Sequence, residues 1–328
     1  KKTWILMNIK VILIVLGEPN STFSEVLFKY FNSKDYKKNN KKKIVLVGSV
    51  KLLKKQMSVL KRNVQLNEIN DVSKSVNKKI NIINVNYDFK KAFSKISKKS
   101  NKYIEECFDL SLKIMKEKNI YALINGPISK KTFLKKKFSG ITEYLSNKTN
   151  SVHEIMLIYN KELAVSPITT HIPIKNVHSK IKKDKICRNV INLYYFYKNI
   201  LKTKSKIAIL GLNPHCETID KFSEEDKIIK PSIKYLNKKG IKVDGPFSAD
   251  TFFLNKNIKK FDLVIGMYHD QVLTPIKSLF KFNAINITAG LPFIRVSPDH
   301  GPNEKMISKN ISDPKSIIES ILFFERNL

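Results

Sequence analysis

Short apolar runs that alternate with longer amphipathic stretches limit most strongly how this chain can fold. Runs rich in Ile, Val and Leu recur near residues 9–16, 43–48, 120–125, 154–159, 163–168, 206–211, 261–267 and 284–288. Amphipathic stretches lie between most of them, at 101–118, 186–203 and 223–238, and another closes the chain at 313–325. This alternation predicts an α/β architecture with largely parallel strands. The lysine-rich stretches 34–43 and 61–79 are poor in core-forming residues, so we expect loops or exposed helix surfaces there.

The size of the chain allows two packed lobes, and its charge needs an explanation. It has 328 residues, 42% of them hydrophobic, and a formal net charge of +33. Such a charge favours a basic nucleic-acid-binding protein as one class of function. However, all but four of the 61 Lys and Arg residues are lysine, and they are spread along the chain without aromatic interleaving. We therefore interpret the charge as solvated surface that can steer anionic, phosphorylated substrates, and we predict no nucleic-acid or membrane partner.

Cysteine usage and the N-terminal stretch indicate a cytoplasmic protein. Cys107, Cys187 and Cys216 form no CxxC pair and are odd in number, so neither a disulfide framework nor a thiolate zinc site is indicated. The apolar stretch 5–16 is short for a membrane span and contains Asn8 and Lys10. We expect a first strand there, with Met7 as a candidate natural start.

The glycines exclude two common nucleotide-binding motifs. The ten glycines are so dispersed that no GxG occurs, and therefore neither a GxGxxG turn nor a GxxxxGK[ST] loop is present. An ordinary Rossmann fingerprint and a Walker A loop are both absent. If the protein uses a dinucleotide, another fold must hold it.

Three histidines each follow a strand-like run. His171, His215 and His269 stand in the contexts TTHIP, LNPHC and YHDQ. The carboxyl ends of parallel strands meet at one edge of a sheet, where α/β proteins bind their ligands. Three imidazoles at that edge could hold one metal ion. A single histidine in such a place is more often a hydrogen-bonded structural residue, which is the alternative for each one taken alone.

Four dense segments also follow apolar runs, and they read NGPISK at 125–130, GLNPH at 211–215, YHDQ at 268–271 and NITAGLPFIR at 286–295. They mix helix breakers, amides and titratable groups, which is typical of ligand loops on a rigid sheet, with tight turns as the alternative. Arg295 is one of only four arginines. A guanidinium in such a loop indicates bidentate recognition of an anion, and an ordinary surface arginine is the alternative.

These segments, together with GEP at 17–19, TTHIP at 169–173, GPFSADT at 245–251 and SPDHG at 297–301, resemble the 4-hydroxythreonine-4-phosphate dehydrogenase family of pyridoxine biosynthesis. The resemblance runs in the same order from about residue 10 to near the C-terminus. It implies a fold of the isocitrate and isopropylmalate dehydrogenase type, with two α/β/α lobes and a cleft between them. We place the first lobe at 1–127 plus 268–328, and the second, with much of the metal site and the dimer interface, at 128–267.

The resemblance also implies the residues of an active site completed by the partner subunit of a homodimer. It makes His171, His215 and His269 the ligands of a divalent metal (Zn, Mg or Co), with His269 coming from the partner. It places four residues on the substrate, namely Thr142, Lys277, Asn286 and Arg295. Asp250 and Asp270 are expected to orient a ligating imidazole or relay the hydroxyl proton, with helix capping as the alternative.

The activity implied is oxidation of 4-phosphooxy-L-threonine with NAD, or NADP, to 2-amino-3-oxo-4-phosphooxybutanoate, which decarboxylates to 3-amino-1-hydroxyacetone phosphate. Two departures affect this expectation. Ile141 stands where the family often has a histidine, and residues 20–24 read NSTFS where the family has a small, glycine-containing loop. We expect them to alter affinity or substrate preference, and a paralogous dehydrogenase of a threonate or erythronate phosphate is the nearest alternative.

Overall fold

The computed structural model describes residues 10–39, 41–135, 137–219, 221–254, 256–281, 283–298 and 301–327. Within it the chain forms two compact units: unit 1 runs up to Val152 and resumes at Leu291, and unit 2 is His153–Gly290. Met7, Asp299 and His300 lie outside the described residues.

The boundaries of the two units differ from the expected ones. Residues 128–152 belong to unit 1 and 268–290 to unit 2, where we had expected the reverse. The reason is packing. Tyr144 and Leu145 are buried in the apolar core of unit 1, whereas the helix that follows residue 268 contacts two strands of unit 2.

Unit 1 is built on six strands that all pair in parallel, in the spatial order β3-β4-β2-β1-β5-β12. They are β1 (Val11–Val15), β2 (Lys43–Gly48), β3 (Leu66–Glu68), β4 (Ile80–Asn84), β5 (Ala122–Asn125) and β12 (Ile294–Pro298). The central strands are apolar on both faces, as expected where helices cover both sides of a parallel sheet.

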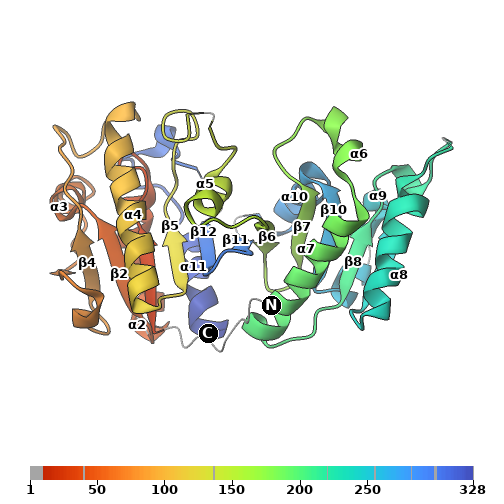
Figure 1. Ribbon diagram of the computed structural model, residues 1–328. Helices are drawn as coiled ribbons and strands as arrows, with labels where there is room; N and C mark the ends of the chain where they lie inside the picture. The colour runs from red at the N-terminus through yellow and green to blue at the C-terminus, as the bar shows by residue number, and fades with distance from the viewer. Residues whose placement is uncertain are drawn as a thin grey trace. The chain divides into compact units, whose positions relative to one another are not determined.

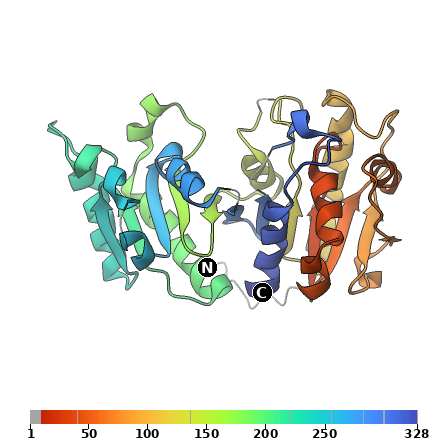
Figure 2. The ribbon, with the colours of Figure 1, turned by 180° about the vertical axis from the view of Figure 1, so that it is seen from behind.

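The helices of unit 1 are α1 (Phe23–Phe31), α2 (Lys34–Asn39), α3 (Val50–Val59), α4 (Asn101–Lys118), α5 (Ile141–Lys148) and α11 (Lys315–Asn327). Helix α4 crosses one face of the sheet and contacts β1 and β2 (Figure 1). Helices α1 and α11 contact each other on the opposite face (Figure 2). The core beneath α4 is aromatic: the Phe108 ring stacks with Phe133 at 6.3 Å and meets Tyr144 edge-on at 5.6 Å.

Unit 2 has the strand order β11-β6-β7-β10-β8-β9. Its strands are β6 (Ile155–Tyr159), β7 (Ala164–Thr169), β8 (Ile207–Leu210), β9 (Val243–Phe247), β10 (Leu263–Tyr268) and β11 (Ile285–Ala289). Strands β7, β10, β8 and β9 pair in parallel, whereas β6 is antiparallel to both of its neighbours. The expectation of largely parallel strands is therefore confirmed, with β6 as the exception.

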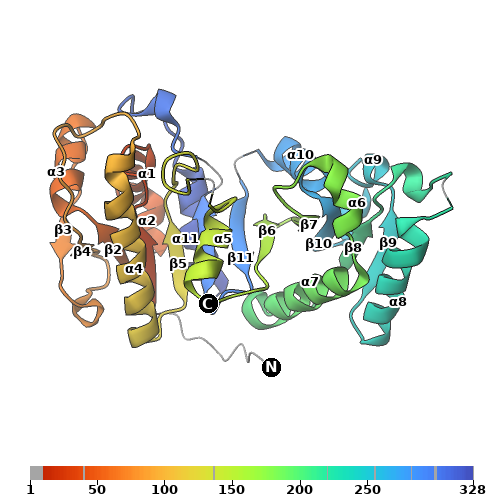
Figure 3. The same cartoon turned by 45° about the horizontal axis from the view of Figure 1, so that its top comes forward.

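The helices of unit 2 are α6 (Val177–Lys180), α7 (Lys183–Phe196), α8 (Lys230–Lys238), α9 (Ala249–Phe252) and α10 (His269–Phe280). Helices α7 and α8 pack side by side on one face, and α10 contacts β7 and β10 on the other (Figures 1 and 2). Figure 3 shows α6, α9 and α10 at one end of this unit. That end is formed by the carboxyl ends of the parallel strands.

All eight predicted strand runs form strands, and the helices cover the predicted amphipathic stretches. Strands β3, β4, β9 and β12 were not predicted. The stretch 61–79, expected to be loop or helix surface, contains the short edge strand β3. All three cysteines carry free thiols. Among the described residues, no helix is both long enough and apolar enough to span a membrane.

We expect Phe108→Ala to lower the free energy of unfolding by about 3–5 kcal/mol, because it leaves a cavity beneath α4 that its neighbours cannot fill. Chemical denaturation measures this. Val59→Ala, at a position that is 47% exposed in the same unit, should change stability by about 0.5 kcal/mol or less. An equal effect of the two substitutions would contradict the packing described above.

Candidate functional site

The three predicted histidines follow three neighbouring parallel strands. Strand β10 lies between β7 and β8 and pairs in parallel with both. His171 comes two residues after β7, His215 five residues after β8, and His269 directly after β10 as the first residue of α10. The sheet therefore delivers all three to the same edge, as the sequence predicted.

Two of these histidines lie side by side. The ring centroids of His171 and His269 are 5.7 Å apart, with the rings tilted by 38°. The backbone at His171 (φ 41°) and at His215 (φ 55°) is in the left-handed region, which is uncommon for residues other than glycine. Such conformations persist only where the surroundings enforce them, and they concentrate at functional sites.

A carboxylate faces each of two histidines. Asp270 Oδ1 lies 2.7 Å from Nδ1 of His269, and Asp250 Oδ2 lies 3.6 Å from Nδ1 of His215, which is an ion-pair distance too long for a hydrogen bond. The Ser248 hydroxyl donates to Asp250 and, with the nearby His215, lowers the pKa of that carboxyl. Contacts at Nδ1 leave Nε2 of each ring for a ligand. Both predicted aspartates thus contact the predicted imidazoles.

The donor set fits a divalent metal in kind, but one chain does not gather it completely. Imidazoles whose second nitrogen faces a carboxylate are the usual arrangement at catalytic zinc sites. Within the described part of a single chain, however, no group of three or more His, Cys, Asp or Glu side chains is close enough to hold a metal ion. The chain itself brings together the pair His171 and His269.

Arg295 lies in a strand, where we had expected a loop. It is part of β12 and is 1% exposed, which makes it one of the largest fully buried side chains of the described chain. Its Nε donates to Oδ1 of Asn125 at 2.7 Å, and its Nη1 lies 3.4 Å from the hydroxyl of Thr142. Burial lowers the pKa of Arg295 to about 9, and the nearby Glu143 opposes this shift. The guanidinium therefore remains charged at neutral pH.

The four predicted substrate residues fall into two pairs. Thr142, in α5, meets Arg295 in unit 1, whereas Lys277 and Asn286 belong to unit 2. Lys277 is exposed on α10, and Asn286 lies in β11. The side-chain oxygen of Asn286 is buried and has no hydrogen-bond partner among the described residues. A buried acceptor of this kind is suited to a ligand that brings a donor.

Glu18 is a buried carboxyl that sequence reasoning left without a role. It is 1% exposed, and it accepts hydrogen bonds from the backbone N–H of Asn20 (3.1 Å) and the hydroxyl of Ser100 (3.0 Å). Burial raises its pKa, although these hydrogen bonds oppose the shift. Asn20 in turn accepts from the N–H of Ser94 at 2.8 Å. Polar side chains thus fix the loop that replaces the family's glycine-containing one. In the sequence, only the motif GEP at 17–19 pointed to Glu18.

Ile141, which stands where the family often has a histidine, is partly buried and packs against the apolar core of unit 1. Next to Thr142, this chain therefore has an apolar side chain in a packing contact, where a histidine would present a polar group.

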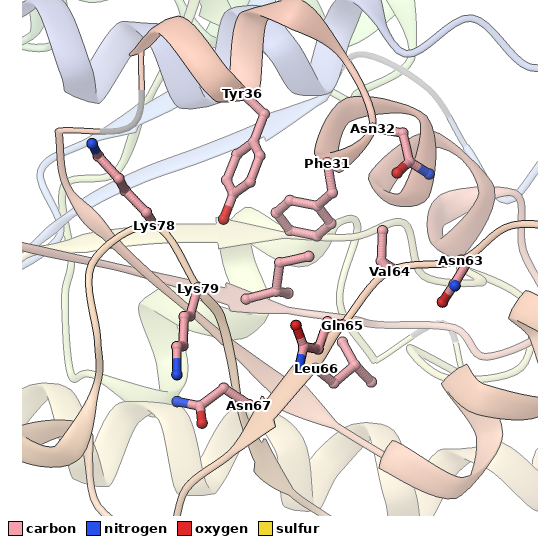
Figure 4. A pocket seen from close by; sticks show the side chains of 11 residues that line it. Phe31, Asn32, Tyr36, Asn63, Val64, Gln65, Leu66, Asn67, Lys78 and Lys79 are labelled. Carbon is pink, nitrogen blue, oxygen red and sulfur yellow. The ribbon is translucent and has the colours of Figure 1, made fainter.

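A separate pocket lies at the amino ends of β3 and β4, with a volume of about 260 Å³ (Figure 4). Its lining combines the rings of Phe31 and Tyr36 with the amides of Asn63, Gln65 and Asn67 and the exposed Lys78 and Lys79. None of the candidate site residues of unit 1 lines this pocket. They lie in other elements or follow the carboxyl ends of their strands, whereas the pocket lies at the amino ends of β3 and β4.

Comparison with known proteins identifies the family. The family model described as "Pyridoxal phosphate biosynthetic protein PdxA" matches residues 40–323. The chain belongs to this family. The 4-hydroxythreonine-4-phosphate dehydrogenase of Sulfurihydrogenibium sp. (strain YO3AOP1) is 40% identical over 314 residues, which cover 94% of this chain and 95% of the relative. The crystal structure of 4-hydroxythreonine-4-phosphate dehydrogenase from Klebsiella pneumoniae matches with a TM-score of 0.83 and 25% identity, covering 96% of this chain and 98% of the other.

Two further matches bear on the expectations above. The isocitrate dehydrogenase of Methylococcus capsulatus matches with a TM-score of 0.50 at 10% identity, covering 97% of this chain and 85% of the other, which supports the predicted fold type alone. The D-threonate 4-phosphate dehydrogenase of Pectobacterium atrosepticum is 28% identical over 320 residues, covering 95% of this chain and 97% of the relative.

The raised pKa of Glu18 predicts a specific pH dependence. The folded protein retains the Glu18 proton at pH values where the unfolded chain has already lost it, so stability falls as pH rises from the unfolded pKa through the folded one. Glutamine does not titrate, so Glu18→Gln removes this loss of stability at higher pH. We therefore expect the stability of the variant relative to the parent to be greater at pH 7 than at pH 4, as measured by chemical denaturation across that range. For the exposed Glu68→Gln we expect no such trend, and a flat difference for Glu18→Gln as well would refute the assignment.

Proposed function

We propose that this chain is a metal-dependent 4-hydroxythreonine-4-phosphate dehydrogenase of pyridoxine biosynthesis, with NAD or NADP as hydride acceptor. The observation that carries the proposal is the delivery of His171, His215 and His269 to one sheet edge, in a chain of this family. The reaction removes a hydride from the carbon that carries the secondary hydroxyl of 4-phosphooxy-L-threonine, and it removes the proton from that hydroxyl. The resulting ketone is β to the carboxylate, and loss of CO2 gives 3-amino-1-hydroxyacetone phosphate.

The chain's own residues have distinct tasks in this proposal. A divalent ion (Zn, Mg or Co) held by the three histidines would lower the pKa of the substrate hydroxyl and stabilise the enolate left after decarboxylation. Asp270 and Asp250 orient His269 and His215 through their Nδ1 atoms, or relay the hydroxyl proton.

The substrate has anionic groups at both ends, and fixed cations are needed to orient them. Arg295 and Lys277 supply this charge. Thr142 and Asn286 supply the accompanying polar contacts. The buried, unpaired oxygen of Asn286 supports its role, because it can accept a hydrogen bond from the substrate amine or hydroxyl.

We further propose a cytoplasmic homodimer in which the partner subunit contributes His269. The family resemblance is the ground for this arrangement, and the described part of one chain has no complete metal-binding group. The 5.7 Å between the ring centroids of His171 and His269 in the same chain counts against it, so the mixing experiment below decides. The buried free thiols of Cys107 and Cys187 are compatible with a reducing compartment.

A D-threonate 4-phosphate dehydrogenase is the second candidate. It is favoured by the similarity to the Pectobacterium atrosepticum enzyme and by Ile141, which packs into the core beside Thr142. The two substrates differ at the carbon next to the carboxylate, which carries an amine in one and a hydroxyl in the other. Comparing kcat/KM for both substrates, by NADH absorbance with a divalent cation present, decides between these functions. A preference for the threonate would assign the second one.

We expect His215→Ala to lower metal-dependent NADH formation from 4-phosphooxy-L-threonine by more than about 100-fold while the fold persists, because a ligand of the metal is lost. Addition of a chelator to the parent enzyme should have the same effect. The control is His153→Ala, an exposed histidine of the same unit, which should retain activity. Full turnover by His215→Ala would remove the metal role assigned to this residue.

Mixing two inactive variants tests the shared site. If His269 comes from the partner, a heterodimer of one His215→Ala chain and one His269→Ala chain contains one intact and one doubly damaged site. Random reassortment should then restore about a quarter of the parent activity. If all three ligands came from one chain, every site in the mixture would be damaged and no activity would return. The measurement is NADH formation after the mixed variants have been dissociated and reassociated.

A further inference from the structure

The loop that carries His215 is held by a buried carboxylate to which no role has been given so far. Glu225, at the start of the π-helical turn Glu225–Ile229, is 0% exposed. Its Oε1 accepts from the backbone N–H groups of Leu212 (2.7 Å) and Asn213 (2.9 Å). Its Oε2 accepts from the side-chain amide of Asn213 (2.9 Å) and the hydroxyl of Ser223 (3.2 Å). Four donors thus converge on a single side chain.

The loop needs such support because its backbone is strained. His215 (φ 55°) and Cys216 (φ 63°) are both in the left-handed region, which side chains other than glycine adopt at a cost. The loop also folds tightly around its first residue. A Cβ on Gly211 would lie 2.7 Å from Sγ of Cys216 and 3.1 Å from Oε1 of Glu225. The carboxylate therefore fills the interior of the turn that presents His215.

A second side chain joins this loop to the neighbouring strand. Gln271, two residues after His269, donates from Nε2 to the carbonyl of Gly211 at 2.7 Å. Its Oε1 accepts from the N–H of Met267, also at 2.7 Å. The Thr169 hydroxyl donates to the carbonyl of the same Met267 at 2.7 Å. The ends of β7, β10 and β8 are thus linked through side chains at the point where their backbone ladder stops.

We propose that Glu225 and Gln271 are positioning residues for the metal site: Glu225 fixes the His215 turn, and Gln271 fixes that turn to the end of β10, so that His215 keeps its place on the sheet edge whichever subunit supplies His269. The inference rests on the proposed function, because it takes the histidines as metal ligands. A purely structural role would also call for an acceptor at Glu225, so the test has to measure the metal site itself. An apolar residue could fill the space of Glu225, whereas only an acceptor can hold the two loop N–H groups.

The test is the affinity and visible absorption of Co²⁺ bound to the intact protein, measured without substrate. Glu225→Leu removes every acceptor at similar size, and Gln271→Met removes the bridge between the strands. Each should weaken Co²⁺ binding by about 10- to 100-fold and change the intensity of the cobalt absorption band, which depends on coordination geometry. Glu225→Gln keeps one oxygen for the N–H groups of Leu212 and Asn213, so its affinity should lie between those of the parent and Glu225→Leu.

The control is Glu25→Leu in unit 1. Glu25 is equally buried, at 1% exposed, and accepts from the N–H of Ser312 and from Lys29. Its loss should lower stability, as measured by denaturation, and leave Co²⁺ affinity unchanged.

The outcomes separate this inference from the function on which it rests. A parent that binds no Co²⁺ would overturn both. A parent that binds Co²⁺, with Glu225→Leu and Gln271→Met within about twofold of it, would overturn the positioning roles alone. If Glu225→Leu does not fold, Gln271→Met and Glu225→Gln decide the result by the same criterion.

Discussion

The candidate metal site depends on the parallel pairing of β7, β10 and β8. The interior of these strands is fully buried, with Val165, Val264 and Ala208 all 0% exposed, so the register in which they pair is fixed by what each face buries. A slip of one residue would turn every side chain to the opposite face of the sheet. It would also move one histidine along the edge relative to the other two. The packing of apolar side chains thus determines where the imidazoles lie.

In each unit, a polar side chain pairs with backbone groups near the carboxyl end of a strand. The partly buried Gln271 pairs with Met267 in β10 and with Gly211 just beyond β8, and the buried Glu18 accepts from the backbone N–H of Asn20 beyond β1 and from the Ser100 hydroxyl. A buried polar group destabilises the fold unless it is paired, so each of these positions accepts only a residue with the right donors and acceptors. The result is a rigid rim around the loops, which a catalytic site needs and which an apolar core alone cannot supply.

The sequence predicted those parts of the structure that follow from continuous apolar patterns or from a motif. Strands β1, β6 and β8 are unbroken apolar runs, β7 is interrupted only by Ser166 and Pro167, and β10 only by Gly266. The three histidines follow β7, β8 and β10. The missed strands carry polar or helix-breaking residues within them: Asn81 in β4, Gly245 and Pro246 in β9, and Arg295 in β12. The polar ones are tolerated because of long-range hydrogen bonds, from Asn81 Nδ2 to the Ile44 carbonyl (3.0 Å) and from Arg295 Nε to Asn125 Oδ1 (2.7 Å). Local patterns do not contain such contacts, and for the same reason the role of Glu225 could not be predicted from them.

The charge of the chain divides into a large exposed part and a small buried one. The many exposed lysines act through water, where salt screens their field beyond about 8–10 Å. Arg295 is instead 1% exposed, held by Asn125 and Thr142, and surrounded by groups that cannot reorient as water does. A charge in such surroundings attracts an anion several times more strongly than the same charge at the surface. The lysines can therefore raise the local concentration of a phosphorylated substrate, but orientation of the substrate requires a cation fixed by the fold. Of the two cations assigned to the substrate, Lys277 is exposed on α10, whereas Arg295 is buried and its position is set by the surrounding structure.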